Sequence, residues 1–361
     1  MKLITDFRNS ELSRRLIEKI EEVATSESKY SIMEVCGTHT VSIFKYGIRS
    51  VLPENVELIS GPGCPVCVTS QGEIDAIFQI VKNNDISLLT FGDLMKVPGS
   101  SGENLIDLRS EGKDIRVMLS PLDAVKTAAR EPDREFVFVG IGFETTAPAI
   151  ALALLEAKNM GVRNFSILPY CKTMPEVLGY LLDDPQLDIK GFLCPGHVSV
   201  VTGKGIFQPL AQRGKAAVIT GFEPLDILSS ILHIVRQVNS GDYCVYNNYS
   251  RVVNNAGNKK ALQIIDTVFE PCSAFWRGLG DLKGSGLGLK EEFSSFNSLE
   301  KFNVKVSQFS EKKGCRCGDV LKGYIKPNLC PLYGLQCTPE NPVGPCMVSS
   351  EGACAAYYRF N

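Results

Sequence analysis

Short apolar segments alternate with helical patterns over residues 30–240, and this alternation constrains the fold more than any other feature of the chain. Amphipathic stretches such as Ala147–Lys158 separate the apolar segments and follow the helical period. Strands joined through helices form parallel sheets that are covered on both faces. The sequence therefore predicts an α/β protein with strands at Ile32–Val35, Val56–Ile59, Ile86–Thr90, Ile115–Leu119, Phe136–Ile141, Phe165–Leu168, Gly191–Leu193 and Ala217–Thr220.

The eight predicted strands divide by position into two groups of four, on either side of residues 131–133. The eight strands could form a single sheet, but the length fits two Rossmann-like parallel-sheet domains better, at 30–130 and 131–240. The remaining segments, 1–29 and 241–361, are expected to form a third, irregular domain that carries most of the cysteines.

Two local patterns accompany this division. Leu12, Leu16 and Ile20 recur on one face of a predicted helix over residues 10–24, which Ser10 is expected to cap. The glycine-rich segment Gly278–Gly288 lacks the strand and helix that flank a phosphate-binding loop, and is predicted to be a plain loop.

Charge and hydropathy exclude several classes of partner. The net charge is -2 with 22% charged residues, so bulk charge does not predict binding to nucleic acid or to an anionic membrane. No apolar run approaches the length that spans a bilayer, and the first residues lack the apolar core of a signal peptide. We expect a cytoplasmic protein.

Cysteine usage is the unusual quantity, with thirteen cysteines in all and six between Cys315 and Cys354. In a reducing cytosol such crowding favours metal ligands or redox groups over structural disulfides. This tail lacks the paired Cys-x-x-Cys spacing of most zinc sites, which favours a [4Fe–4S] cluster and leaves zinc as an alternative. The candidate ligands are Cys315, Cys330, Cys337 and Cys354, with Cys317 and Cys346 interleaved.

Two further cysteine motifs follow predicted strands. Cys64 and Cys67 form a Cys-x-x-Cys pair at the start of a predicted helix, where the helix terminus favours a thiolate and the spacing permits a reversible disulfide. Half of a zinc site or two buried thiols are the alternatives. Cys36 and His39 lie in a turn before a helix, and a low-pKa thiolate beside an imidazole suits a nucleophile or a soft metal ligand.

Polar residues in glycine motifs also follow the predicted strands. The carboxyl ends of parallel strands meet at one edge of a sheet, where open α/β proteins bind ligands. Helix capping explains many such residues, and orientation of a ligand or a partner's tail in a cleft is the functional alternative. The candidate cleft residues are Thr38, Asp93, Glu144, Thr145, Thr146, His197 and Glu223.

Taken in order, these motifs resemble the HypD family of [NiFe]-hydrogenase maturation proteins. The resemblance runs nearly end to end and is carried by Cys36-Gly-Thr-His-Thr40, Gly61-Pro-Gly-Cys-Pro-Val-Cys67, Gly142-Phe-Glu-Thr-Thr-Ala-Pro148, Pro195-Gly-His-Val-Ser199 and Glu351-Gly-Ala-Cys-Ala-Ala-Tyr-Tyr358. It implies a scaffold on which the Fe(CN)2CO group of the hydrogenase is assembled, rather than a free-standing enzyme.

The resemblance also implies partners and roles. HypC contributes a cysteine to the iron, and HypE brings cyanide as a thiocyanate on its C-terminal cysteine. Cys36 would hold the iron beside His39, and Cys64 and Cys67 would be redox-active. The four tail cysteines, Cys315, Cys330, Cys337 and Cys354, would hold a [4Fe–4S] cluster. The expected state is a monomer that joins transient complexes.

Two other functions stay open on the sequence. A free-standing thiol-disulfide oxidoreductase would use Cys64 and Cys67 without partners. A zinc-stabilised interaction module would use the tail cysteines without redox chemistry.

Overall fold

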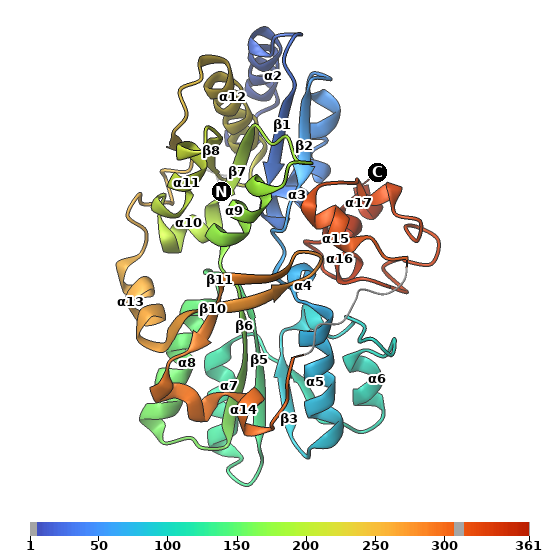
Figure 1. Cartoon of the computed structure of the whole chain (residues 1–361), viewed down its shortest axis with the longest axis vertical. Helices are drawn as coiled ribbons and strands as arrows, with labels where there is room; N and C mark the ends of the chain where they lie inside the picture. Colours follow the sequence, from blue (N-terminus) through green and yellow to red (C-terminus); the bar gives the residue numbers. More distant parts are fainter. Residues whose placement is uncertain (1–5, 307–313, 361) are drawn as a thin grey trace.

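Two parallel sheets, each covered by helices, occupy the upper and lower halves of the molecule in Figure 1. The computed structural model describes residues 6–306 and 314–360 of the chain. The first sheet has the strand order β2-β1-β7-β8-β9, with β1 at Tyr30–Glu34, β2 at Val56–Ser60, β7 at Gly191–Pro195, β8 at Ala216–Thr220 and β9 at Val245–Asn247. The second has the order β4-β3-β5-β6, with β3 at Ser87–Thr90, β4 at Ile115–Val117, β5 at Phe136–Gly142 and β6 at Phe165–Cys171.

All eight predicted strands are present, and the α/β architecture with parallel sheets is confirmed. Every residue of β1 and β5 is buried, because helices cover both faces of each sheet. A strand that is buried on both faces needs a continuous apolar run rather than an alternating one, which is why the short apolar segments located these strands.

The predicted grouping of the strands is wrong. β3 pairs with β5, and β7 pairs with β1, so each sheet takes strands from both sides of residues 131–133. The bounds 30–130 and 131–240 therefore each include strands of both sheets. Apolar patterning predicts where a strand lies but not which strand it pairs with. Every buried parallel strand offers the same backbone N–H and C=O groups along its edges.

Helices surround both sheets. Those beside the first sheet are α2 (Ser10–Val23), α3 (Gly37–Lys45), η1 (Ile48–Val51), α9 (Met174–Asp183), α10 (Gly196–Thr202), η3 (Gly205–Phe207), α11 (Gln208–Gln212) and α12 (Pro224–Ser240). Those beside the second are α5 (Gln71–Asn83), η2 (Gly92–Leu94), α6 (Leu105–Ser110), α7 (Pro121–Arg130), α8 (Ala147–Met160), α13 (Lys259–Val268), η4 (Glu291–Phe296) and α14 (Ser298–Lys301). None of the helices in the described residues is long and apolar enough to cross a bilayer.

Helix α2 packs against α12 beside the first sheet (Figure 1). Ile20 is its one fully buried side chain. The cap is Asn9 rather than the predicted Ser10, because the Asn9 side chain accepts hydrogen bonds from the backbone N–H groups of Glu11 and Leu12.

An antiparallel pair crosses the middle of the molecule (Figure 1), formed by β10 (Phe269–Trp276) and β11 (Gly280–Leu289). β11 occupies the segment that was predicted to be a loop, so that prediction is wrong. A Cβ atom on Gly286 would lie 2.8 Å from the Cβ of Ala274. The glycine therefore allows close strand approach here instead of marking a turn.

The C-terminal segment lies beside the first sheet, next to α3 (Figure 1). It contains α15 (Cys317–Lys322), η5 (Pro327–Leu329), α16 (Pro345–Val348) and α17 (Ala353–Phe360). A short helix, α4 (Pro65–Val68), contacts α16 where the chain passes from the first sheet to the second. One apolar core joins these parts and includes Met33, Val139 and Cys346.

Candidate functional site

Cys36 is the N-cap of α3, directly after β1, and is 8% exposed. Burial, followed by the nearby Glu351 carboxylate, raises the pKa of Cys36 to about 11, although the backbone N–H groups of His39 and Thr38 oppose the shift. The prediction of a low-pKa thiolate at Cys36 is therefore wrong for the metal-free protein. Desolvation raises the pKa of the thiol more than the helix N-terminus lowers it. Cys36 is a protonated thiol that a bound metal ion would ionise.

Glu351 is a site residue that the sequence analysis did not single out. Its Oε1 accepts a hydrogen bond of 2.5 Å from the Thr38 hydroxyl. A Cβ atom on Gly37 would lie 2.5 Å from the Glu351 Cβ, so the C-terminal segment rests directly on the start of α3. The available signal was the motif itself, in which Glu351 stands three residues before Cys354.

His39 lies in the first turn of α3, whereas it was predicted to lie in the turn before that helix. Its Nε2 is 3.2 Å from Thr220 O and 3.1 Å from Gly221 O, so Nε2 carries the proton and donates. Burial lowers the pKa of His39 to about 4, which keeps the ring neutral. Its buried Nδ1 has no partner among the described residues.

Phe222 joins the two histidine motifs. Its ring stacks on His39 at 4.7 Å and on His197 at 4.0 Å between ring centroids. Both histidines follow neighbouring strands, β1 and β7, so the two Cys-x-x-His segments lie side by side. Cys194 itself is fully buried in β7.

A disulfide joins Cys64 and Cys67 across α4. The segment that carries it touches the Cys36 segment, because the Gly37 N–H donates to Gly63 O at 3.2 Å. A Cβ atom on Gly63 would lie 2.2 Å from Cys36 N, so only glycine permits this approach. The structure thus brings two of the three predicted cysteine motifs together.

A cavity of about 350 Å³ opens beside this junction, and we call it the Asp93 cavity. It lies at the carboxyl ends of β3 and β5, as expected for an open α/β sheet. The residues that line it include Pro65, Asp93, Thr146, Ser349 and Glu351. It therefore touches the disulfide helix, the second sheet and the C-terminal segment together.

The other predicted cleft residues are more dispersed. Glu144 is buried, and its Oε1 accepts a hydrogen bond of 2.8 Å from Met174 N. Burial raises the pKa of Glu144 to about 7. Glu223 forms a two-pronged ion pair with Arg8, at 2.5 and 2.9 Å, and Thr145 is exposed without lining the cavity.

The four predicted tail ligands line one small cavity together with Cys317, Arg316 and mainly apolar neighbours. Val343 N donates to Cys337 Sγ at 3.3 Å, and hydrogen bonds of this kind stabilise a cluster-bound thiolate. Among the described residues, no three His, Cys, Asp or Glu side chains are grouped as ligands of a single metal ion. A [4Fe–4S] cluster takes one thiolate on each of four irons, so its ligands must share one cavity, and Cys315, Cys330, Cys337 and Cys354 are among the five cysteines that line this one.

Cys317 and Cys346 are buried beside this set, and spacing alone gave them no role. Interactions with Cys315, and then with Cys346, raise the pKa of Cys317 well above its ordinary value. Pro345 O lies 3.9 Å from Cys67 Sγ. Cys317 also lines the cavity, and Pro345, the residue before Cys346, brings the C-terminal segment into contact with the Cys64–Cys67 disulfide.

Comparison with known proteins shows which family the chain belongs to. The family model HypD, described as the hydrogenase formation hypA family, matches residues 11–361. The chain is 44% identical over 368 residues to the hydrogenase maturation factor HypD of Cupriavidus necator, an alignment that covers 100% of this chain and 97% of that protein. The chain belongs to the HypD family.

Two further HypD proteins are similar over their full length. The Escherichia coli K12 hydrogenase maturation factor HypD is 42% identical over 369 residues, covering 100% of this chain and 98% of that protein. The Rhodobacter capsulatus HypD is 43% identical over 371 residues, with the same coverage. The resemblance found in the motifs is thus confirmed, and this HypD-family chain is a hydrogenase maturation factor.

Proposed function

We propose that this chain is the redox-active scaffold on which the iron of a [NiFe]-hydrogenase receives its cyanide and carbonyl ligands, together with HypC-type and HypE-type partners. The observation that carries the proposal is the contact between the Cys36 and Cys64–Cys67 segments, made through Gly37 N and Gly63 O. The Cys36 thiol, which would bind the iron, and the Cys64–Cys67 pair, which would supply electrons, then lie in neighbouring segments.

The Cys64–Cys67 pair suits the release of cyanide from a partner's thiocyanate. In the reduced pair, one thiolate attacks the sulfur of the S–CN group, the S–C bond breaks, and cyanide leaves with the bonding electrons. The second thiol then displaces the partner's thiolate, which forms the Cys64–Cys67 disulfide and releases two protons overall. Two electrons have moved from the dithiol to the thiocyanate, and the product is the disulfide of this structure.

Cys36 suits the iron that is the cargo of this reaction. The thiol is neutral and buried, so it reacts slowly with ordinary electrophiles and stays available for a soft metal ion. The neutral His39 adds no charge beside it. Glu351 is the one carboxylate that acts on the Cys36 thiol.

The tail cysteines fit a resident [4Fe–4S] cluster, with Cys315, Cys330, Cys337 and Cys354 as the four ligands. When bound, this group would supply single electrons. The C-terminal segment contacts the disulfide through Pro345 and the packing of α16 on α4, which supports a redox role over a purely structural one.

Replacement of Cys36 tests the iron site. We expect Cys36→Ala, purified without oxygen in complex with a HypC-type partner, to lose the cyanide and carbonyl bands in its infrared spectrum. Cys244→Ala is the matched control, because Cys244 is exposed and far from these motifs in the sequence. Bands of full strength in the Cys36→Ala complex would show that Cys36 is not an essential iron ligand.

Metal analysis of the anaerobically purified chain tests the tail. We expect iron and acid-labile sulfide with a brown chromophore in the wild type, and loss of all three in Cys330→Ala. Cys272→Ala, which changes a cysteine of β10, is the control. Zinc without sulfide would instead support the interaction-module alternative.

The free-standing oxidoreductase is the second candidate. Cys64 is 4% exposed and Cys67 is fully buried, so a folded disulfide substrate cannot reach them directly. Turnover of a small disulfide by the isolated chain, abolished in Cys64→Ser, would favour that alternative over the scaffold.

A further inference from the structure

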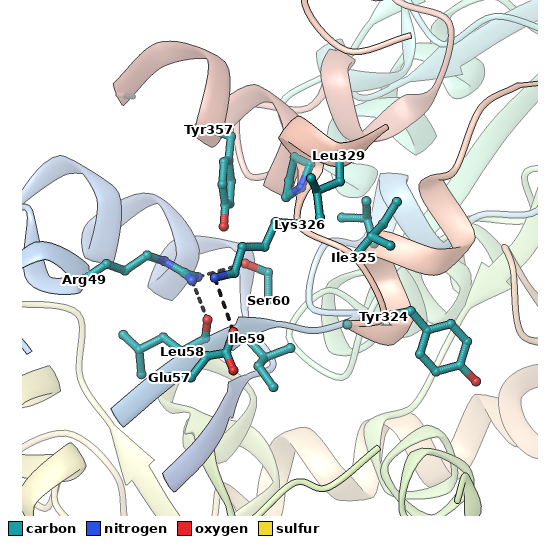
Figure 2. Close-up of a pocket in the computed structure, with 13 residues that line it drawn as sticks. Arg49, Glu57, Leu58, Ile59, Ser60, Tyr324, Ile325, Lys326, Leu329 and Tyr357 are labelled. Atoms are coloured by element: carbon teal, nitrogen blue, oxygen red, sulfur yellow. Dashed lines mark hydrogen bonds and ion pairs between the residues drawn. The ribbon is translucent and has the colours of Figure 1, made fainter. Parts of the chain in front are cut away.

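We propose that a second pocket, at the free edge of the first sheet, binds a carboxylate that carries a short apolar group. This pocket has a volume of about 370 Å³ and lies between the edge strand β2 and the C-terminal segment. We call it the Tyr357 pocket. Figure 2 shows the residues that form it, among them Arg49, Ser60, Ile325, Lys326, Leu329 and Tyr357.

The Tyr357 hydroxyl is the first observation. The residue is only 5% exposed, and its hydroxyl points into the pocket, towards Arg49 and Lys326 (Figure 2). Within residues 6–306 and 314–360 it has no hydrogen-bond partner. The hydroxyl is therefore free to donate a hydrogen bond to a ligand oxygen that enters the pocket. Burial raises the pKa of Tyr357, so the hydroxyl stays a donor.

Arg49 supplies the fixed positive charge. Its Nη2 donates to Glu34 Oε1 at 2.7 Å and to Ser60 Oγ at 3.2 Å, and its Nη1 donates to Leu58 O. Its guanidinium also lies over the Tyr357 ring, 5.7 Å from the centroid. These contacts hold the group rigid, so little entropy is lost when it meets a ligand.

The charges around the pocket favour an anion. Lys326 Nζ lies 3.3 Å from Glu57 Oε1 at the rim, and Lys29 Nζ lies 2.9 Å from the other oxygen of the same carboxylate. Among the described residues, two cations, Arg49 and Lys326, and one carboxylate, Glu57, line the pocket, while Glu34 pairs with Arg49 and Lys29 with Glu57 outside the lining. The excess of one positive charge matches a monovalent carboxylate better than a phosphate dianion.

Apolar side chains form the rest of the wall and define the ligand further. Ile59, Ile325 and Pro327 line the pocket, and Leu329 stands at its rim with 64% of its surface exposed. An aliphatic group beside the carboxylate would cover these side chains. Two sources share this chemistry, a small branched-chain acid and the carboxyl terminus of a peptide that ends in an apolar residue.

The Tyr357 pocket is separate from the proposed assembly site. It shares no lining residue with the Asp93 cavity, and none of the cysteines lines it. Its occupant is therefore additional to the iron and the cyanide donor of the proposed function.

Calorimetric titration of the full chain tests the pocket with three probes: 4-methylpentanoate, the peptide Ala-Ala-Ala-Leu, and the same peptide with an amidated C-terminus. We expect saturable millimolar binding of 4-methylpentanoate, of the free-acid peptide, or of both, and none of the amide. Binding of the acid alone assigns a small-molecule site, and binding of the free-acid peptide assigns a chain terminus.

Tyr357→Phe should weaken this binding about tenfold, which is the effect of losing one hydrogen bond to a charged group. The variant should fold normally, because the hydroxyl has no partner within the described protein. Tyr358→Phe is the matched control and should bind like the wild type. No saturable binding at millimolar concentrations, or equal affinities for the two variants, would overturn the proposal.

Discussion

Burial keeps Cys36 and His39 in their neutral forms. Desolvation raises the pKa of Cys36 to about 11 and lowers that of His39 to about 4. Sequence reasoning identified both residues from their motif, but it could not see the burial and therefore expected a thiolate. Whether a residue at a helix N-terminus ionises depends on how deeply that terminus is buried from solvent.

Glu144 offers a pH-dependent test of this burial. Burial raises its pKa from 4.5 to about 7, so the folded protein keeps a proton that the unfolded chain loses. Its contribution to stability is present below about pH 4.5 and is lost as the pH rises to about 7. Glu144→Gln cannot ionise, and Gln can still accept from Met174 N. We expect the variant to gain up to about 3 kcal/mol over the wild type across this range.

Urea unfolding at several pH values between 5 and 8 measures this difference. Glu156→Gln, at an exposed position on α8, is the control and should follow the wild type at every pH. A pH-independent difference between Glu144→Gln and the wild type would contradict the shifted pKa.

Among the secondary-structure elements, close backbone approach is the feature that sequence patterns miss. Gly63 lets the loop after β2 touch the start of α3, and Gly286 lets β11 pair with β10. The first glycine lay in a motif that was predicted to be part of a site. The second lay in a glycine-rich run that was interpreted as a loop, because glycine is depleted in most strands.

Gly63→Ala tests the first of these approaches. The new methyl group would lie 2.2 Å from Cys36 N, so the backbone must shift. We expect a loss of about 1–3 kcal/mol in the free energy of unfolding, as for other overpacked sites. Gly205→Ala is the matched control, since no atom lies within 4 Å of the added Cβ. Equal unfolding midpoints for the two variants would show that the close contact between Gly63 and Cys36 does not limit the size of the residue at position 63.

At the scale of the whole molecule, the sequence predicted the positions of the strands better than their pairing in the two sheets. The apolar runs located β1 to β8, and the motifs after them located Cys36, Cys64, Cys67 and the tail cysteines. Pairing between β1 and β7 joins segments about 160 residues apart, and a single sequence carries no signal for such a pairing. For the same reason Glu351, which reaches the site from the far end of the chain, was missed.

This topology predicts that neither half of the chain folds alone. A fragment of residues 131–240 contains β5 and β6 without β3, and β7 and β8 without β1. We expect it to show no cooperative urea transition by circular dichroism, in contrast to the full chain. A cooperative transition in the isolated fragment would mean that half-sheets suffice for stability.

The interleaved strand order has a consequence for biosynthesis. As the chain leaves the ribosome, β3 to β6 are complete before the first sheet can close, because β1 waits for β7. The nascent protein therefore carries β1 and β2, with their apolar faces, as an unfinished pair through much of translation. Such an intermediate is a natural client for chaperones, and overproduction of this chain should benefit from slower synthesis.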